Sequence, residues 1–94
     1  MRANRIDANQ TEIIKYFRSM GCYVLNISSL KNCCDILVSK NGATVAIEIK
    51  DGSKPKSARR LTSGEAKFRD EWQGAWRLCE SLEDAEKIYI DCFL

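Results

Sequence analysis

The 94-residue sequence has no histidine, only one proline and no long apolar run. A membrane-spanning helix needs roughly 18 or more apolar residues in a row, so we expect none here. The missing histidines, and the lack of any CxxC pair among the five cysteines, argue against a structural zinc site. With 45% hydrophobic and 30% charged residues, the chain has the composition of one small, soluble globular domain.

The N-terminus is polar and contains no apolar segment of the kind that secretory signals carry. We therefore expect a cytoplasmic protein whose cysteines stay reduced and serve mainly as small apolar side chains. These cysteines are Cys22, Cys33, Cys34, Cys79 and Cys92.

Charge is distributed unevenly along the chain, although the net charge is only +2. Residues 1–60 carry eleven Lys and Arg against five Asp and Glu, whereas residues 61–94 carry four against eight. Such asymmetry favours a polyanionic partner for the first part of the chain, although a solvated charged loop would give a similar pattern. The densest basic run consists of Lys50, Lys54, Lys56, Arg59 and Arg60.

Hydrophobic periodicity and turn signals predict seven regular elements in the order α-β-β-β-α-β-α. Asn41-Gly42 favours a tight hairpin between the second and third strands, and Thr62 with Glu65 forms a capping box before the second long helix. Asp7 or Asn9 can cap the first helix. The expected fold is α/β, with a mixed sheet flanked by helices. The expected ranges are helix 9–19, strands 22–27, 35–39 and 44–50, a loop 51–62, a helix from 63 to about 72, strand 75–79 and a last helix from 82.

Asp35, Glu48 and Lys50 are the strongest candidates for residues that carry out chemistry. Glu48 and Lys50 lie two apart on the third strand and so share one sheet face, and folding about the hairpin places Asp35 beside Glu48. Two close carboxylates repel each other, and a hard divalent cation such as Mg²⁺ or Mn²⁺ resolves that conflict. A lysine beside such an ion can position or activate water for phosphodiester hydrolysis. The alternative is ordinary: Glu-x-Lys is common on solvated strands, and an Asp near a strand start is often a turn residue.

Asp35 is followed, after twelve intervening residues, by Glu48-Ile49-Lys50. This spacing resembles the PD-(D/E)XK nuclease signature. The wider pattern is similar to the VRR-NUC branch of that superfamily, small phage and bacterial proteins related to Holliday-junction resolvases. The matching segments span residues 7 to about 76, most of the chain. They are residues 7–13, 33–38, 45–52 and 59–62.

This resemblance implies a restriction-endonuclease-like fold and Mg²⁺- or Mn²⁺-dependent DNA cleavage. By analogy, Asp35 and Glu48 would bind the metal together with the backbone carbonyl of Ile49, and Lys50 would be the catalytic lysine. Glu12 would support the metal from the first helix, and Gln10 would contact DNA or metal-bound water. Both of these helix residues could instead have purely structural roles, and for Gln10 the structural role is the stronger expectation.

The chain departs from the family pattern at two positions. Cys34 stands where the family has the proline before its aspartate, which supplies no ligand, so little should change. Glu65 stands where the family usually carries glutamine on the second long helix. It could add negative charge near the metal or serve only the capping box, and the capping box alone would account for it.

Two classes of function follow from these features. The first is a metal-dependent DNA endonuclease that works as a homodimer, with branched or Holliday-junction DNA as a candidate substrate. It would hold the phosphate backbone through Lys54, Lys56, Arg59 and Arg60. The second is a non-catalytic nucleic-acid-binding module that retains the nuclease fold; an RNA-directed nuclease is a weaker third alternative. The dimer is also suggested by the C-terminal segment, which has more apolar residues than one helix face can bury.

Overall fold

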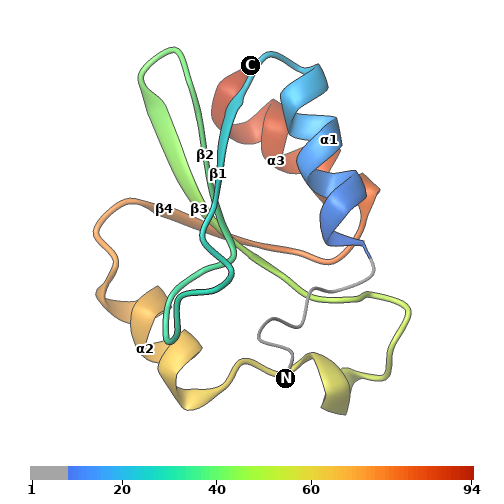
Figure 1. Ribbon diagram of the computed structural model, residues 1–94, viewed down its shortest axis with the longest axis vertical. Helices are drawn as coiled ribbons and strands as arrows, with labels where there is room; N and C mark the ends of the chain where they lie inside the picture. The colour runs from blue at the N-terminus through green and yellow to red at the C-terminus, as the bar shows by residue number, and fades with distance from the viewer. Residues whose placement is uncertain (1–8) are drawn as a thin grey trace.

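A computed structural model describes residues 9–94 as a sheet with helices packed against it (Figure 1). The predicted element order is confirmed, and the boundaries differ from expectation by only one or two residues. The elements are α1 (Gln10–Ser19), β1 (Tyr23–Asn26), β2 (Ile36–Lys40), β3 (Ala43–Ile49), the short 3₁₀ helix η1 (Lys56–Arg59), α2 (Ser63–Glu71), β4 (Ala75–Cys79) and α3 (Leu82–Phe93).

The sheet has the strand order β1-β2-β3-β4. The first three strands form an antiparallel meander, and β4 joins β3 in parallel after the crossover through α2. The turn between β2 and β3 is tight because Asn41 and Gly42 both adopt positive φ, 52° and 86°, as a two-residue hairpin turn requires. The expected mixed α/β sheet is therefore present, and its hairpin fixes which residues of β2 and β3 face each other.

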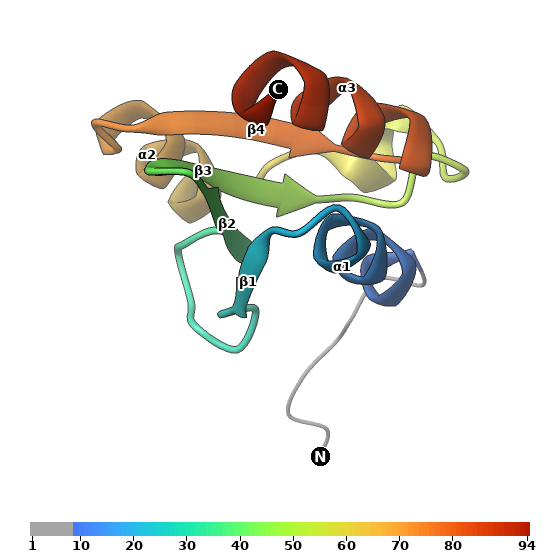
Figure 2. The ribbon, with the colours of Figure 1, turned by 90° about the horizontal axis from the view of Figure 1, so that it is seen from above.

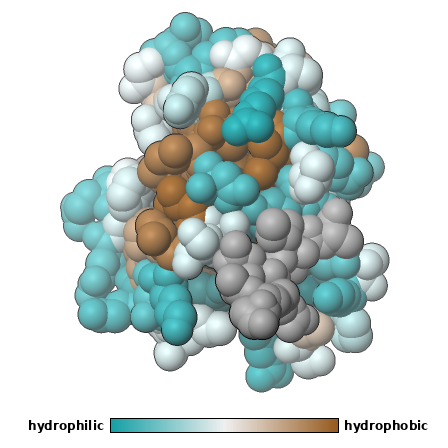
Figure 3. All heavy atoms as spheres, viewed as in Figure 1, coloured by the Kyte–Doolittle hydropathy of each residue, from teal (hydrophilic) through white to brown (hydrophobic). Residues whose placement is uncertain are grey.

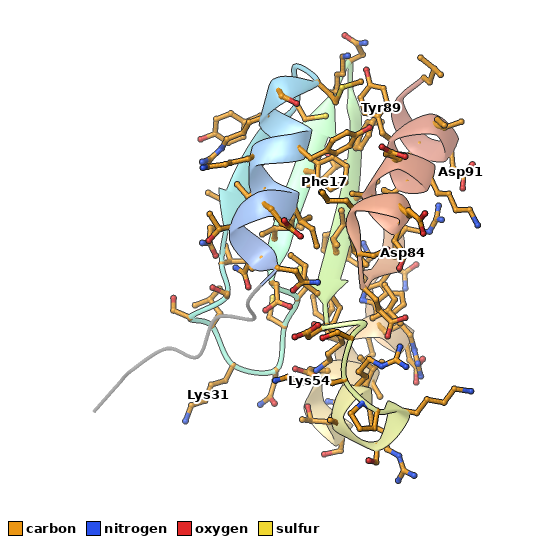
Figure 4. All side chains as sticks on the ribbon, turned by 90° about the vertical axis from the view of Figure 1, so that its right-hand side faces the viewer. Phe17, Lys31, Lys54, Asp84, Tyr89 and Asp91 are labelled. Atoms are coloured by element: carbon orange, nitrogen blue, oxygen red, sulfur yellow. The ribbon has the colours of Figure 1, made fainter. Side chains whose placement is uncertain are left out.

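Helices α1 and α3 lie side by side over one face of the sheet (Figures 2 and 4). Alternate residues of the strands, such as Ile36 and Ile47, point to this face and are fully buried against Ile13, Phe17 and Ile88. Figure 4 shows Phe17 and Tyr89 reaching into the space between the two helices. The period-2 strand pattern and the helical spacing of these apolar residues together create a single core on this side.

The opposite face of the sheet is more open. Tyr23 is 70% exposed there and Leu25 45% exposed, and Leu78 on β4 is 36% exposed. Figure 3 shows apolar side chains at the surface where β1 crosses the view, with hydrophilic side chains around them. Helix α2 lies toward one end of the sheet (Figure 1), so it leaves much of this face without a helical cover.

Two local expectations differ from the structure. Asn9 occupies the N-cap position of α1 but makes no side-chain capping bond. Its amide instead donates hydrogen bonds to the carbonyl oxygens of Lys50 and Glu80, at 3.0 and 3.2 Å, because the start of α1 lies against the ends of β3 and β4. The alternative cap, Asp7, lies outside the described residues. The segment 51–62, expected to be entirely loop, contains one turn of 3₁₀ helix, η1.

All five cysteines are free, as expected. Across residues 9–94, no helix combines the length and the apolar character that crossing a membrane requires.

Candidate active site

The β2–β3 hairpin places Asp35 directly beside Glu48. The paired register of the two strands ends with Ile36 opposite Ile47. Asp35 and Glu48 are the residues next to this last pair on their strands, and their side chains interact by a hydrogen bond and by charge. The backbone N–H of Asp35 donates to the Ile47 carbonyl at 3.0 Å. Ile49 in turn donates its N–H to Asp35 Oδ2 at 2.7 Å. The backbone of β3 therefore holds the Asp35 carboxylate against the strand that carries Glu48.

Glu48 is a buried acid on the sheet face opposite α1 and α3. Only 3% of the residue is exposed. The pKa of Glu48 is raised to about 9, mainly by burial and then by the charge and hydrogen bond of Asp35. The charge of Lys50 lowers the pKa, but by less than these effects raise it. At neutral pH the pair therefore shares a proton, with Glu48 as its carrier.

Lys50 lies next to this pair and makes its closer contact elsewhere. Its Nζ is 3.8 Å from Glu48 Oε2 but only 3.0 Å from Glu65 Oε1. Burial lowers the pKa of Lys50, but the hydrogen bond and charge of Glu65, with the charges of Glu48 and Asp35, outweigh burial and raise it. Lys50 is therefore a positively charged group among three carboxyl groups.

Glu65 combines the two roles that the sequence left open. It is the third residue of α2, where it completes the predicted capping box: Thr62 Oγ1 accepts from the Glu65 N–H at 3.1 Å, and Glu65 Oε1 accepts from the Thr62 N–H at 2.9 Å. The same oxygen also accepts the hydrogen bond from Lys50. Burial raises the pKa of Glu65, but the hydrogen bonds from Thr62 and Lys50 outweigh it and lower the pKa. The sequence signals for Glu65 were the capping box and its place at the family's usual glutamine, and neither could show that Glu65 contacts Lys50.

The two paired carboxyls suit one mode of metal binding. Among residues 9–94, no three side chains of the His, Cys, Asp and Glu types are gathered into a complete metal site. Mg²⁺, however, usually binds through one or two carboxylates and keeps several waters or substrate phosphate oxygens as its other ligands. Asp35 and Glu48 fit that mode, since they lie side by side and their like charge disfavours ionisation of both without a cation.

The two helix residues assigned by analogy do not join this cluster. Glu12 is exposed and lines a cavity of about 490 Å³ with residues of α3 and the loop after β3; its lining does not include Asp35, Glu48 or Lys50. Gln10 is buried, 2% exposed, and its amide donates to Asn26 Oδ1 at 3.4 Å. The described contacts thus give Glu12 no link to the carboxyl pair and place Gln10 in the interior, away from a nucleic-acid surface.

The basic loop after Lys50 is only partly available for a ligand. Lys54, Lys56 and Arg60 are exposed; Lys54 can be located in Figure 4, where it is labelled. Arg59 is instead held inward, because its guanidinium pairs with Glu80 at 2.9 Å and donates to the Lys54 carbonyl at 2.8 Å. Three of the four predicted phosphate-binding side chains therefore face solvent, and the fourth braces the loop.

Cys34, which replaces the family's proline, is a packed interior residue. It is 2% exposed, and its thiol donates to the Ile36 carbonyl at 3.4 Å. Burial, followed by the neighbouring Cys33, raises the pKa of Cys34 to about 12. The thiol is thus protonated at neutral pH and supplies no reactive thiolate beside Asp35.

Comparison of the chain with protein-family models, with curated proteins and with solved structures found no match. The resemblance to VRR-NUC nucleases therefore stays a prediction from the sequence motifs.

Proposed function

We propose that this protein is a Mg²⁺- or Mn²⁺-dependent nuclease that hydrolyses phosphodiester bonds in DNA. The observation that carries the proposal is the placement of Asp35, Glu48 and Lys50 at the open end of one hairpin. Burial and mutual repulsion hold one of the two acids protonated, and an ammonium group lies within 4 Å of that acid. Perturbed acids with a specific charged neighbour occur preferentially at functional sites.

Stability alone gives a poor reason for this arrangement. A buried carboxyl pair costs free energy on folding, and apolar residues would pack the same sheet position more favourably. Ala46 and Ile47, the neighbours of Glu48 on β3, are fully buried without any polar group. A function for the charged cluster therefore explains its presence better than a structural role does.

Each member of the cluster has a distinct task in the proposed reaction. Asp35 and Glu48 would hold the cation, with the backbone carbonyl of Ile49 as the expected third protein ligand. When bound, the ion would supply Lewis-acid polarisation of a phosphate oxygen. Lys50 would orient the attacking water by hydrogen bonding and offset the negative charge that develops on the phosphate in the transition state.

The substrate would be held through its backbone rather than read by sequence. Lys54, Lys56 and Arg60 are exposed in the loop that begins directly after Lys50. Lysine and arginine contacts to phosphates position a nucleic acid and provide salt-dependent affinity without sequence information. A preference for branched DNA, including Holliday junctions, would then depend on the shape of the substrate.

The proposal includes a homodimer, which would bring one site to each of two strands. The exposed side chains of Tyr23 and Leu25, two residues apart on the open face of β1, support an interface because small soluble domains rarely leave such apolar groups together at the surface. The C-terminal helix contributes fewer candidates than its sequence suggested: Ile88 and Tyr89 are buried, whereas Ile90 and Leu94 are exposed.

Cleavage of plasmid DNA and of a synthetic four-way junction, with Mg²⁺, Mn²⁺ or EDTA, tests the proposal. We expect metal-dependent cleavage that Lys50→Ala removes and that Lys87→Ala, at an exposed lysine of α3, leaves intact. Equal cleavage by both variants would show that Lys50 is not catalytic. Salt-sensitive DNA binding that is unchanged by EDTA, with no cleavage under either metal, would instead identify a nucleic-acid-binding module.

A further inference from the structure

The closest partner of Lys50 comes from outside the Asp35–Glu48–Lys50 set. Glu65 Oε1 is 3.0 Å from Lys50 Nζ, whereas Glu48 Oε2 is 3.8 Å away. A lysine side chain is a flexible four-carbon stem and needs a fixed partner if its ammonium is to occupy one place. The longer distance to Glu48 makes it the weaker of the two partners. The ammonium is therefore held mainly from α2.

Glu65 is itself held rigidly. Its carboxylate receives the Thr62 N–H, and its own N–H bonds to the Thr62 hydroxyl, so both ends of the residue are fixed by the capping box. Only 22% of its side chain is exposed. A carboxylate constrained in this way can define the position of a flexible ammonium group.

The first turn of α2 also lies close to the loop that leads into Asp35. A Cβ atom on Gly64 would lie 1.8 Å from Asn32 Oδ1, far inside any van der Waals contact. Asn32 has φ 58°, a left-handed conformation that asparagine tolerates better than most residues. With the Asn32 side chain in this position, only a glycine fits at position 64, and Glu65 is the next residue along the helix.

We propose that Glu65 is the positioning residue of Lys50, and that the close contact of Asn32 with Gly64 sets where Glu65 lies. This inference rests on the proposed nuclease function for its catalytic consequence. The contact joins two elements that are distant in sequence: the loop that leads into Asp35 and the helix that contains Glu65. Acid, lysine and positioning carboxylate are thereby held at fixed distances from one another.

The first test compares Glu65→Ala with Glu65→Gln, which keeps an oxygen acceptor for both Lys50 and Thr62. We expect the alanine variant to lower kcat by on the order of 10²-fold with KM little changed, because a small displacement of a catalytic group has effects of that size. The glutamine variant should retain most of the activity. Glu83→Ala, at an exposed acid of α3, is the matched control, so its kcat should stay near the wild-type value.

A second readout does not depend on catalysis. Acylation of lysines by a soluble reagent, followed by mass spectrometry, reports how firmly each ammonium is held. We expect Glu65→Ala to raise the labelling rate of Lys50 several-fold relative to that of Lys87, and Glu65→Gln to raise it less. An unchanged Lys50 rate in folded Glu65→Ala protein would overturn the proposal, whether or not the wild type cleaves DNA.

The contact between Asn32 and Gly64 has its own test by second-site rescue. Gly64→Ala should lower kcat and raise Lys50 labelling, because the new methyl group collides with Asn32. Adding Asn32→Gly to that variant makes room for the methyl group and keeps a residue that accepts positive φ, so both measurements should return toward wild type. A Gly64→Ala defect that Asn32→Gly does not relieve would show that this contact does not set the position of Glu65. If labelling follows these expectations while no variant, wild type included, cleaves DNA, the positioning role stands and the nuclease function fails.

Discussion

Ile49 donates its backbone N–H to the Asp35 carboxylate at 2.7 Å, which ties the acid before β2 to the strand that carries Glu48 and Lys50. A hydrogen bond of this kind fixes the direction in which the carboxylate oxygen points. Burial, followed by the charge of Asp35, raises the pKa of the neighbouring Glu48 to about 9. One backbone bond therefore holds Asp35 against the strand of the second acid.

Glu48→Gln should flatten the dependence of stability on pH. The pKa of Glu48 is about 9 in the folded chain against 4.5 for an ordinary glutamic acid, so its stabilising contribution is complete below about pH 4.5. That contribution declines as the pH rises and is lost through about pH 9. Denaturant unfolding measured from the ordinary pKa of 4.5 up to the raised pKa of about 9 should show wild-type stability declining with a steeper slope than that of the variant. The exposed Glu83→Gln serves as the control. Parallel curves for wild type and Glu48→Gln would contradict the raised pKa.

Mg²⁺ or Mn²⁺ should stabilise the wild-type chain more strongly at higher pH. Metal binding requires Glu48 to release its proton, so the affinity rises as protons become scarcer. At a metal concentration about 100 times Kd, the gain in unfolding free energy would be about 2.7 kcal/mol. Thermal unfolding with and without metal measures the gain.

The matching variants are Asp35→Asn and Glu48→Gln, both of which should lose this stabilisation. Glu12→Gln should keep it, because Glu12 lines a cavity that does not include the carboxyl pair. A loss in Glu12→Gln equal to that in Asp35→Asn would restore the role that the family resemblance assigned to Glu12.

Lys56→Ala and Arg59→Ala should affect DNA binding in different ways. Lys56 is exposed, so its loss should weaken binding evenly across sequences and reduce the slope of log affinity against log salt by about 1. Arg59 is paired with Glu80, so its loss should leave the salt slope nearly unchanged and instead lower the stability of the loop. Affinity measured across a salt series distinguishes the two, and an equal change of slope would show that Arg59 contacts phosphate.

Leu25→Lys should dissociate the proposed homodimer. Leu25 is 45% exposed on the open sheet face, and a buried unpaired lysine at an interface is strongly unfavourable. The matched control is Leu82→Lys, which changes a leucine with 40% exposure at the start of α3, away from that face. Light scattering after size-exclusion chromatography gives the mass of each. A wild type that is monomeric at all concentrations would contradict the dimer.

The local elements of this protein are determined by its sequence. Alternating apolar residues specify the strands, Asn41-Gly42 specifies the hairpin because those residues accept positive φ, and the capping box of Thr62 and Glu65 specifies the start of α2. Because a tight hairpin fixes register up to Ile36 opposite Ile47, the sequence also determined that the next residues, Asp35 and Glu48, are neighbours. Each of these features depends on residues that lie close together along the chain.

Tertiary packing decided what no local pattern could. Glu65 accepts a hydrogen bond from Lys50, Gln10 is buried, and Arg59 pairs with Glu80. These contacts join residues many positions apart and depend on how whole elements approach one another. Composition and periodicity record which face of an element is apolar, but not which charged side chain of another element will lie 3 Å away.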